Sequence, residues 1–502
     1  MSFFKNGGVV TAVDNGYFYS GSEAFPVSTP MRSALYVGDS ITAFSEVVAS
    51  AITITNLGDG TANVNRNAHS MSVGNPVRTA AAPDPAVNVL NATVIRIVDA
   101  NNFVISLDGP VHDVTGAAPV VAHPLRGSTR GWVSWLEAAM GRLLEKTWCA
   151  IPGARMSDIT DVLPKIAQGH EDIAFVCMGM NDIYSANLSL AQCQAAFESM
   201  MPHVLVRSGR VVILSVPPRN SADPAWTAAK QIIHTGFNKY LYGRCVDEGW
   251  LFVDTWRSAQ DNLTYVNSGA ANPDPNAAMS FDNTHPSMRG AAAIGNAAFN
   301  VMSKWLGIDE WKGSHPEDIN ADIGNLLPLS DFSTDAAGVA TGWARSDVTA
   351  AMNAVFTMEA RTVAVDGDSC GRNQVMTINY GAAAGTASCR FRMNNIQASV
   401  VAGRSYQMLV PFRVTGAVGL VGLELAMFGT VGTAFWLTFA QNQDSNADPI
   451  SGAFEGVLVT PVSECPVGVT DLDVWVRPYI NATQVADVVI RVWQPQLYDV
   501  AQ

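Results

Sequence analysis

The sequence predicts an α/β protein that carries additional all-β modules. Between about residues 131 and 306, short apolar runs alternate with segments in which apolar residues recur at helical spacing. Such alternation is typical of a parallel sheet covered by helices. From about residue 47 to 125, and again from about 325, helical spacing gives way to short alternating strands separated by turn residues. These two stretches predict a small all-β insert and a C-terminal β domain.

The parallel sheet is predicted from four apolar runs, each of a length suited to one buried strand. They lie at residues 34–37, 173–178, 210–216 and 250–254. Helices are predicted at residues 132–144, 157–163, 226–244 and 287–306. The first of these helices contains two tryptophans, which we expect in the core because packing is the commoner fate of this side chain.

Three segments lie outside this alternation. Residues 1–30 are rich in Gly and Ser and contain short β-like pieces, which suit an attachment arm, an edge element or a frayed start. Within residues 47–125, the runs at residues 69–77 and 98–103 resemble the small β modules of bacteriophage tail proteins. Residues 325–502 predict a β-sandwich, and their pattern resembles jelly-roll carbohydrate-binding modules. For this last domain, glycan binding, oligomer contacts and simple packing on the rest of the chain stay open.

Composition excludes several classes of partner. The formal net charge is −14, and an acidic surface repels nucleic acid and anionic lipid, so we expect neither as a partner. The seven cysteines include no CxxC pair and predict no zinc site, although a bridge between Cys370 and Cys389 stays open. The sequence has no apolar run long enough for a membrane span, and its first residues lack the apolar core of a signal peptide. We therefore expect cytoplasmic synthesis without a signal peptide.

Two short motifs follow predicted strands. Gly38-Asp39-Ser40 comes after the strand at 34–37, and Gly179-Met180-Asn181-Asp182 comes after the strand at 173–178. Open α/β sheets bind their ligands beyond the carboxyl ends of such strands. Ser40 is therefore a candidate nucleophile, and Asn181 is a candidate amide donor to an oxyanion. Alone, each motif is also typical of a turn or a helix cap.

The third motif, Asp282-Asn283-Thr284-His285, is the most specific. Its carboxylate lies three residues before its imidazole, so one turn can bring the carboxylate to Nδ1 and leave Nε2 facing a serine. Pro286 favours an extended conformation at His285, which suits a loop that projects its side chain into a cleft. The three motifs together predict a nucleophile, a base and an orienting carboxylate. A surface histidine held by a neighbouring Asp is the alternative.

These residues resemble the SGNH hydrolases, also called the GDSL lipase/esterase family. The family carries a GDS serine, a glycine, a GxND asparagine and a DxxH histidine. Matching positions here are Ser40, Gly153, Asn181, and Asp282 with His285. The resemblance implies a flavodoxin-like three-layer α/β/α domain over residues 31–46 and 126–315. It also implies ester hydrolysis through an acyl-enzyme, with no metal and no organic cofactor.

The resemblance also assigns a role to each matching residue. Ser40 attacks the ester carbonyl, His285 takes the proton and returns it to the leaving alcohol, and Asp282 holds the imidazole tautomer. The backbone N–H groups of Ser40 and Gly153, with the Asn181 side chain, then meet the oxyanion. The neighbouring carboxylates, Asp39 and Asp182, are expected to shape loops.

A second GDS sequence occurs in Gly367-Asp368-Ser369-Cys370-Gly371 and fits the G-x-S-x-G pattern. That pattern needs a histidine later in the chain, and the last of the eight histidines is His315. We therefore predict that Ser369 lies in a loop between two strands, at residues 362–365 and 375–378.

Aromatic residues near the predicted cleft are candidates for substrate binding. Tyr265 lies in the segment that leads into the histidine motif, where a solvated connection is the alternative. Trp256 and Trp226 are candidates for stacking on a sugar face, with core packing as the alternative.

The sequence thus predicts a serine esterase that removes O-acetyl groups from a bacterial surface polysaccharide. The β modules and the acetylesterases of the family favour a carbohydrate. The insert, the missing signal peptide and the Gly-rich start favour a phage tail fibre or spike, and so location in the virion. A homo-oligomer is expected, since a trimer suits such a fibre, together with other virion tail proteins as partners. The alternatives are a glycan-binding virion adhesin without turnover, and an esterase or lipase acting on small or lipid esters.

Overall fold

The structure is a computed structural model, and the part of the chain that it describes is discontinuous. It describes residues 2–6, 9–14, 17–20, 23–26, 33–49, 52–66, 71, 73–99, 101–112, 119–127, 131–140, 144–166, 169–219, 223, 225–256, 280, 284–286, 288–303, 325–327, 330, 332–346, 352–362, 371–380, 386–415, 420–431, 434–435, 454–460, 463–465, 467–469, 471–481 and 487–499.

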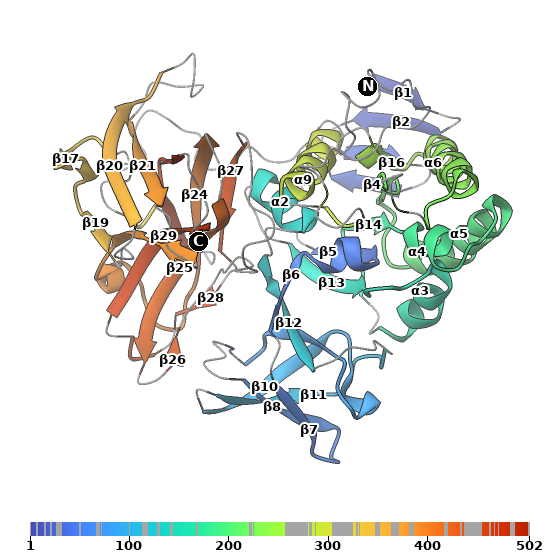
Figure 1. Ribbon diagram of the computed structural model, residues 1–502, viewed down its shortest axis with the longest axis horizontal. Coiled ribbons are helices and arrows are strands. Elements are labelled where there is room, and N and C mark those ends of the chain that lie inside the picture. The colour runs from blue at the N-terminus through green and yellow to red at the C-terminus, as the bar shows by residue number, and fades with distance from the viewer. Residues whose placement is uncertain are drawn as a thin grey trace.

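A parallel sheet of five strands forms the centre of the α/β region (Figure 1). Its strands are β5 (Ser33–Gly38), β13 (Glu145–Ala150), β14 (Ile173–Cys177), β15 (Val211–Leu214) and β16 (Leu251–Val253). Their spatial order is β13-β5-β14-β15-β16, which in chain order is 2-1-3-4-5. This is a doubly wound arrangement, and its switch point lies between β5 and β14. Ligands of such sheets bind beyond the carboxyl ends of the strands at that point.

The apolar runs form this sheet because both of its faces are covered. All residues of β14 are buried, and in β5 only Ser33 is partly exposed. Figure 1 shows two groups of helices on opposite sides of the sheet. One group is α2 (Trp132–Met140) and α9 (Met288–Ser303), and the other is α3 (Met156–Val162), α5 (Leu190–Leu205) and α6 (Ala228–Glu248). Each predicted strand and helix of this region therefore has its counterpart, with ends shifted by a few residues.

An antiparallel sheet interrupts the α/β region directly after the first short helix, α1 (Ser40–Ala43). Its strands are β6 (Glu46–Ala49), β7 (Thr53–Asn56), β8 (Thr61–Asn65), β9 (Pro76–Ala80), β10 (Ala92–Asp99), β11 (Asn102–Ser106) and β12 (Val120–Gly127). They surround a small core of their own, which includes Val77, Val94 and Phe103. The all-β insert is thus a separately packed sheet.

The insert is fastened to the edge of the parallel sheet. The Asn91 side chain donates from Nδ2 to the carbonyl of Trp148 at 3.0 Å and accepts from the Trp148 N–H at 3.1 Å. Trp148 belongs to β13, an edge strand of the sheet. The preceding Leu90 is buried in the core of the α/β region. An amide pair and an apolar anchor therefore fix the insert to β13.

The C-terminal region consists of two antiparallel sheets around one core. The first contains β19 (Trp343–Ser346), β22 (Thr386–Ser388), β23 (Arg390–Met393), β25 (Leu420–Val431), β26 (Ala434–Phe435) and β29 (Asp471–Asn481). The second contains β20 (Met352–Ala360), β21 (Arg372–Tyr380), β24 (Ser405–Thr415), β27 (Phe454–Val459), β28 (Ser463–Glu464), β30 (Val488–Val492) and β31 (Gln496–Asp499). A β-hairpin of β17 (Asp335–Ala336) and β18 (Val339–Ala340) precedes them. Their likeness to a jelly roll stays a prediction.

The C-terminal sheets pack on helices of the α/β region. Trp135 of α2, with Ala291 and Ala292 of α9, belongs to the apolar cluster of the C-terminal core. The Trp135 and Phe412 rings lie 6.4 Å apart between centroids. Trp135 is therefore a core residue, as predicted, but in the contact between two modules. Trp132, the other tryptophan of α2, is fully buried in the α/β core.

Three other predictions have structural outcomes. The first residues form an antiparallel meander of β1 (Ser2–Asn6), β2 (Val9–Asp14), β3 (Tyr17–Ser20) and β4 (Glu23–Pro26), rather than a frayed start. Ser369 lies outside the described residues, between the paired strands β20 and β21. The strand predicted at residues 362–365 is misplaced at its start, since β20 ends at Ala360 and Thr362 is irregular. Cys389 is a buried free thiol, so a bridge to Cys370 is wrong.

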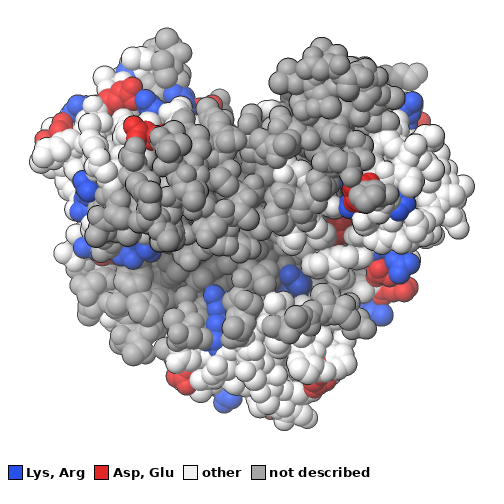
Figure 2. Space-filling model, viewed as in Figure 1, with Lys and Arg blue, Asp and Glu red and all other residues white. Residues whose placement is uncertain are grey.

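The described surface carries both signs of charge. On the face shown in Figure 2, basic and acidic side chains are interspersed over the described atoms and do not gather by sign. Among the helices described, none combines the length and the apolar character that crossing a bilayer requires.

Two glycines provide a matched test of the packing between α2 and α9. A Cβ built on Gly295 of α9 would lie 2.6 Å from the Trp132 carbonyl oxygen and 2.7 Å from the Leu136 nitrogen, both backbone atoms. Gly243 of α6 has no atom near its corresponding position. We expect Gly295→Ala to lower the free energy of unfolding by about 1–3 kcal/mol through overpacking. Gly243→Ala should raise it by about 0.5–1 kcal/mol, because alanine restricts the unfolded chain and favours helix.

Thermal unfolding of both variants beside the parent protein provides the measurement. A Gly295→Ala protein that melts at or above the parent temperature would show that the two helices are not in close contact at this point.

Candidate active site

Ser40 occupies the turn that joins β5 to α1. Asp39 caps α1: its Oδ1 accepts from the Ile41 N–H at 2.9 Å, and its carbonyl accepts from the Ala43 N–H at 2.9 Å. A Cβ on Gly38 would lie 2.3 Å from Thr42 Oγ1, so the helix folds back over the strand end only because residue 38 is glycine. The serine therefore lies at the carboxyl end of a central strand.

His285 reaches Ser40 from the loop before α9. Its Nε2 lies 2.8 Å from Ser40 Oγ, within hydrogen-bonding distance. The ring also contacts Phe44, which ends α1, with 4.6 Å between centroids and 46° between planes. Ser280 Oγ donates to the His285 carbonyl at 3.2 Å. Asp282 lies outside the described residues, so its role stays a prediction.

Asn181 lies at the start of α4 (Met180–Tyr184), directly after β14. Gly179 precedes it with φ +122°, and a Cβ there would lie 2.7 Å from Phe237 Cε1. Both the left-handed backbone and the close ring require glycine. Asn181 Nδ2 donates to the Ala154 carbonyl at 3.1 Å and to Asp39 Oδ2 at 3.4 Å. The amide is thereby held between the serine turn and the loop after β13.

Gly153 lies in that loop, exposed, with φ +80°. The Ala154 N–H donates to the Ile151 carbonyl at 3.0 Å, which closes a turn around Gly153. The Ile151 N–H donates to the Gly38 carbonyl at 3.1 Å. Hydrogen bonds therefore connect the glycine loop to the strand end that carries the serine, and through Ala154 to Asn181.

Two buried carboxyls support these loops. Burial raises the pKa of Asp39 to about 6, against the Ile41 N–H and His285, which lower it. Burial raises the pKa of Asp182 to about 6 as well, while N–H donation from Met156 lowers it. Both Asp182 oxygens lie 3.3 Å from the Met156 nitrogen at the start of α3. The two carboxyls hold backbone N–H groups, which agrees with the loop-shaping role expected from the sequence.

The arrangement suits acyl transfer. A serine hydroxyl is hydrogen-bonded to an imidazole, and a carboxamide that can donate to an oxyanion is bonded to the same turn. Within the described ranges, no group of three or more His, Cys, Asp or Glu side chains is placed to hold a metal ion.

Residues 107–293 match the family model of the GDSL-like lipase/acylhydrolase family. This region is a GDSL-like acylhydrolase domain. The protein is accordingly a carboxylic ester hydrolase. The matched range contains Gly153, Asn181 and His285, and it begins after Ser40, which the β insert separates from the rest of the domain. No curated protein matches the chain.

Solved structures of similar proteins include several esterases. An acetylxylan esterase from Geobacillus stearothermophilus is 16% identical, with a TM-score of 0.29, and the match covers 56% of this chain and 98% of that one. A lipolytic G-D-S-L protein from Veillonella parvula is 14% identical, with a TM-score of 0.28, over 35% and 88%. A carbohydrate esterase family 3 protein from Talaromyces cellulolyticus is 15% identical, with a TM-score of 0.25, over 32% and 72%. At these TM-scores the likenesses decide nothing about the substrate of the acylhydrolase.

The aromatic candidates have mixed outcomes. Trp226 is 5% exposed and belongs to the α/β core, so stacking on a sugar is wrong for this residue. Trp256 is partly exposed three residues after β16, where its ring contacts His234 at 4.9 Å between centroids. Its role in substrate binding stays a prediction. Tyr265 lies outside the described residues. Phe44 was missed, although it follows Ser40 by four residues and therefore lies on the same face of a helical turn.

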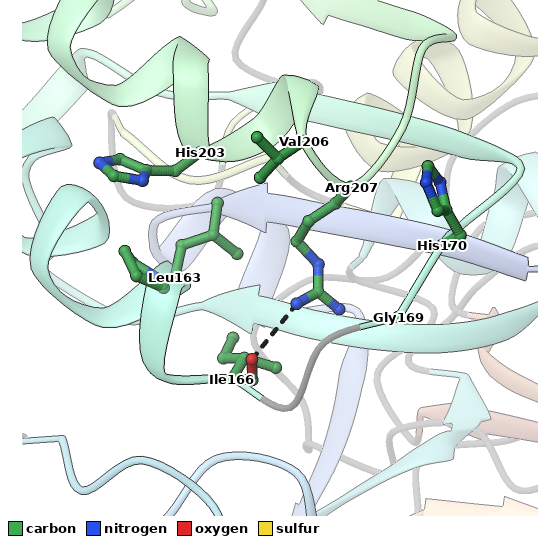
Figure 3. A pocket seen from close by; sticks show the side chains of 8 residues that line it. Leu163, Ile166, Gly169, His170, His203, Val206 and Arg207 are labelled. Carbon is green, nitrogen blue, oxygen red and sulfur yellow. Dashed lines mark hydrogen bonds between the residues drawn. The ribbon is translucent and has the colours of Figure 1, made fainter.

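A cavity of about 570 Å³ (Figure 3) lies near the amino ends of β14 and β15, whereas Ser40 follows the carboxyl end of β5. Its lining includes His170, which precedes β14, and Arg207, which precedes β15. In Figure 3 the Arg207 guanidinium turns toward the Ile166 carbonyl, to which Nη1 donates at 3.3 Å. Arg207 also forms a buried ion pair with Glu171 at 2.7 Å. The cavity is therefore separate from the candidate active site.

Asp182→Asn tests the electrostatics of the site. An unfolded Asp titrates near pH 4, whereas the pKa of Asp182 in the folded protein is about 6. The folded state therefore binds more protons between these values, so this carboxyl stabilises the fold below about pH 4 and loses that effect as pH rises through 6. Relative to the parent, Asp182→Asn should gain about 2 kcal/mol of unfolding free energy between about pH 4 and 7.

His234→Gln is the counterpart with the opposite sign. Burial lowers the pKa of His234 to about 4, so its neutral form stabilises the fold above about pH 6.5 and this effect is lost as pH falls toward 4. Relative to the parent, this variant should gain unfolding free energy as pH falls. Urea unfolding of both variants and of the parent between about pH 4 and 7 measures how each difference in unfolding free energy changes with pH. If both differences changed in the same direction, the environments assigned to Asp182 and His234 would be contradicted.

Proposed function

We propose that this acylhydrolase removes O-acetyl groups from a bacterial surface polysaccharide through an acyl-enzyme on Ser40. The observation that carries the proposal is the distance of 2.8 Å between His285 Nε2 and Ser40 Oγ. A serine so placed has a base within reach of its proton.

The proposed reaction has two steps. As Ser40 Oγ attacks the acetyl carbonyl, its proton passes to His285 Nε2, which then protonates the departing sugar oxygen. Water next attacks the acetyl-serine, gives its proton to His285, and releases acetate while Ser40 regains its hydrogen. The two forming oxyanions accept from the N–H groups of Ser40 and Gly153 and from Asn181 Nδ2. The longer contact of Nδ2, 3.4 Å to Asp39, is the one that is more easily exchanged for the oxyanion.

A polymeric substrate is supported by the modules around the site. Asn91 of the insert is hydrogen-bonded to Trp148 of β13, which precedes Gly153 by five residues. The C-terminal sheets are packed on α2 and α9, and the histidine loop leads into α9. Two additional modules attached to the elements that carry the site suit a long polymeric substrate better than a small ester. Membership of a phage tail, a trimeric state and contacts with other virion tail proteins rest on the sequence patterns alone and stay predictions.

Acetate release tests the proposal. The purified protein should release p-nitrophenol from p-nitrophenyl acetate and acetate from one or more O-acetylated bacterial polysaccharides. Ser40→Ala should lower both rates by at least about 10³-fold, because the nucleophile is lost. Unchanged thermal unfolding of Ser40→Ala confirms that the fold is retained.

Each negative result has a distinct meaning. Turnover of p-nitrophenyl acetate without release from any polysaccharide would retain the esterase and reject the proposed substrate in favour of small or lipid esters. Glycan binding without turnover of either substrate would favour a non-catalytic adhesin. Full activity in Ser40→Ala would overturn the assigned nucleophile.

A further inference from the structure

Arg219 is a buried arginine outside the motifs described above. It follows β15, after Pro217 and Pro218, and only 7% of the residue is exposed. Its guanidinium contacts segments that carry two parts of the candidate active site. We infer that Arg219 is a positioning residue that locks the histidine loop onto the asparagine helix α4. The inference rests on the proposed hydrolysis at Ser40.

The first contact reaches the histidine loop. Arg219 Nη1 donates to Thr284 Oγ1, and Thr284 is the residue directly before His285. This hydrogen bond ties the loop at the peptide adjoining the proposed base. Loss of the bond frees the backbone on one side of the imidazole, while Ser280 holds the carbonyl on the other side.

The second contact reaches α4. The Arg219 Cζ lies 3.5 Å from the centroid of the Tyr184 ring, which places the guanidinium over the ring face. Tyr184 is the last residue of α4, the helix that begins with Met180 and carries Asn181. Stacking of a guanidinium on an aromatic ring is favourable and also fixes the plane of its donors. One side chain therefore connects the proposed base with the proposed oxyanion donor.

Arg219 itself is held firmly. Asp223 Oδ2 accepts from Nη2 at 2.5 Å and from Nε at 3.1 Å. This carboxylate compensates the positive charge, so the arginine does not oppose formation of an imidazolium nearby. The Arg219 hydrogen bond in turn lowers the pKa of Asp223 below its ordinary value.

The segment that carries Arg219 is also fixed by α6. Asn238 Oδ1 accepts from the Val216 N–H at 2.8 Å, and Nδ2 donates to the Val216 carbonyl at 3.0 Å. His234 Nε2 lies 3.0 Å from the carbonyls of Val216 and Pro217. Two buried side chains thus position the backbone just before Arg219. A backbone fixed in this way allows Arg219 to set the position of the histidine loop.

The inference predicts a loss in kcat with little change in KM. A displacement of about 1 Å in a catalytic group lowers rates by about 10²-fold, so we expect Arg219→Ala to lower kcat for p-nitrophenyl acetate by that order. The KM should change little, because the inferred role gives Arg219 contacts with Thr284, Tyr184 and Asp223 and none with the substrate. Added guanidinium at millimolar concentration should fill the vacated site and restore part of the lost kcat.

Two further variants separate a positioning role of Arg219 from a role in folding. Thr284→Val retains Arg219 and the side-chain volume but removes the acceptor, so it should lower kcat in the same direction. The loss in the double variant should be smaller than the product of the two single losses, since both remove one interaction. Arg207→Ala is the matched control, because Arg207 is also a buried, ion-paired arginine but lies at the amino ends of the strands, whereas Ser40 follows a carboxyl end. Arg207→Ala should lower the free energy of unfolding, and added guanidinium should not raise the kcat of this variant.

The outcomes separate this inference from the proposed function. An active parent protein whose kcat is unchanged in Arg219→Ala and Thr284→Val would overturn the inference alone. A loss in Arg219→Ala that guanidinium does not relieve, with Thr284→Val fully active, would assign Arg219 to folding only and also overturn it. If Arg219→Ala does not fold, Thr284→Val and Arg219→Lys decide between these results. A parent protein without esterase activity, in which Ser40 does not react with a fluorophosphonate, would overturn both proposals.

Discussion

The hydrogen bond between Ser40 Oγ and His285 Nε2 joins side chains 245 positions apart in the sequence. The order of the parallel sheet adds the third group, because β5 and β14 are neighbours and their carboxyl ends place the serine turn beside the asparagine helix. No local sequence feature produces that proximity. The site exists only after the long-range pairing of β5 with β13 and β14 is complete, so the function depends directly on the register of the sheet.

At the carboxyl ends of the strands, hydrogen bonds connect the loops that form the candidate active site. Gly38 accepts from the Ile151 N–H, Asn181 donates to Ala154 and Asp39, and Met156 donates to Asp182. Most of these partners are backbone groups, whose positions are set by strand ends and helix starts. Such a network gives a preorganised site, in which little rearrangement is needed when charge develops on the substrate.

The sequence predicted the α/β region well because its signals are local. A continuous apolar run such as 173–178, short and followed by glycine, favours a strand covered on both faces, and the motifs at Ser40 and Asn181 come directly after the strand ends. The features that escaped prediction are long-range. Arg219 is a lone arginine after two prolines, and nothing nearby in the sequence indicates that Thr284 is its acceptor. Trp226 was considered as a sugar platform because burial of a single tryptophan depends on tertiary packing.

The amide pair between Asn91 and Trp148 has a consequence beyond the attachment of the insert. β13 is an edge strand, and an edge strand with free N–H and C=O groups is a template onto which another polypeptide can add. Asn91 supplies from its side chain the donor and the acceptor that a neighbouring strand would otherwise offer. The insert thus occupies the edge of β13 at Trp148, where a strand from a second molecule would otherwise pair, and so disfavours edge-to-edge association at this point.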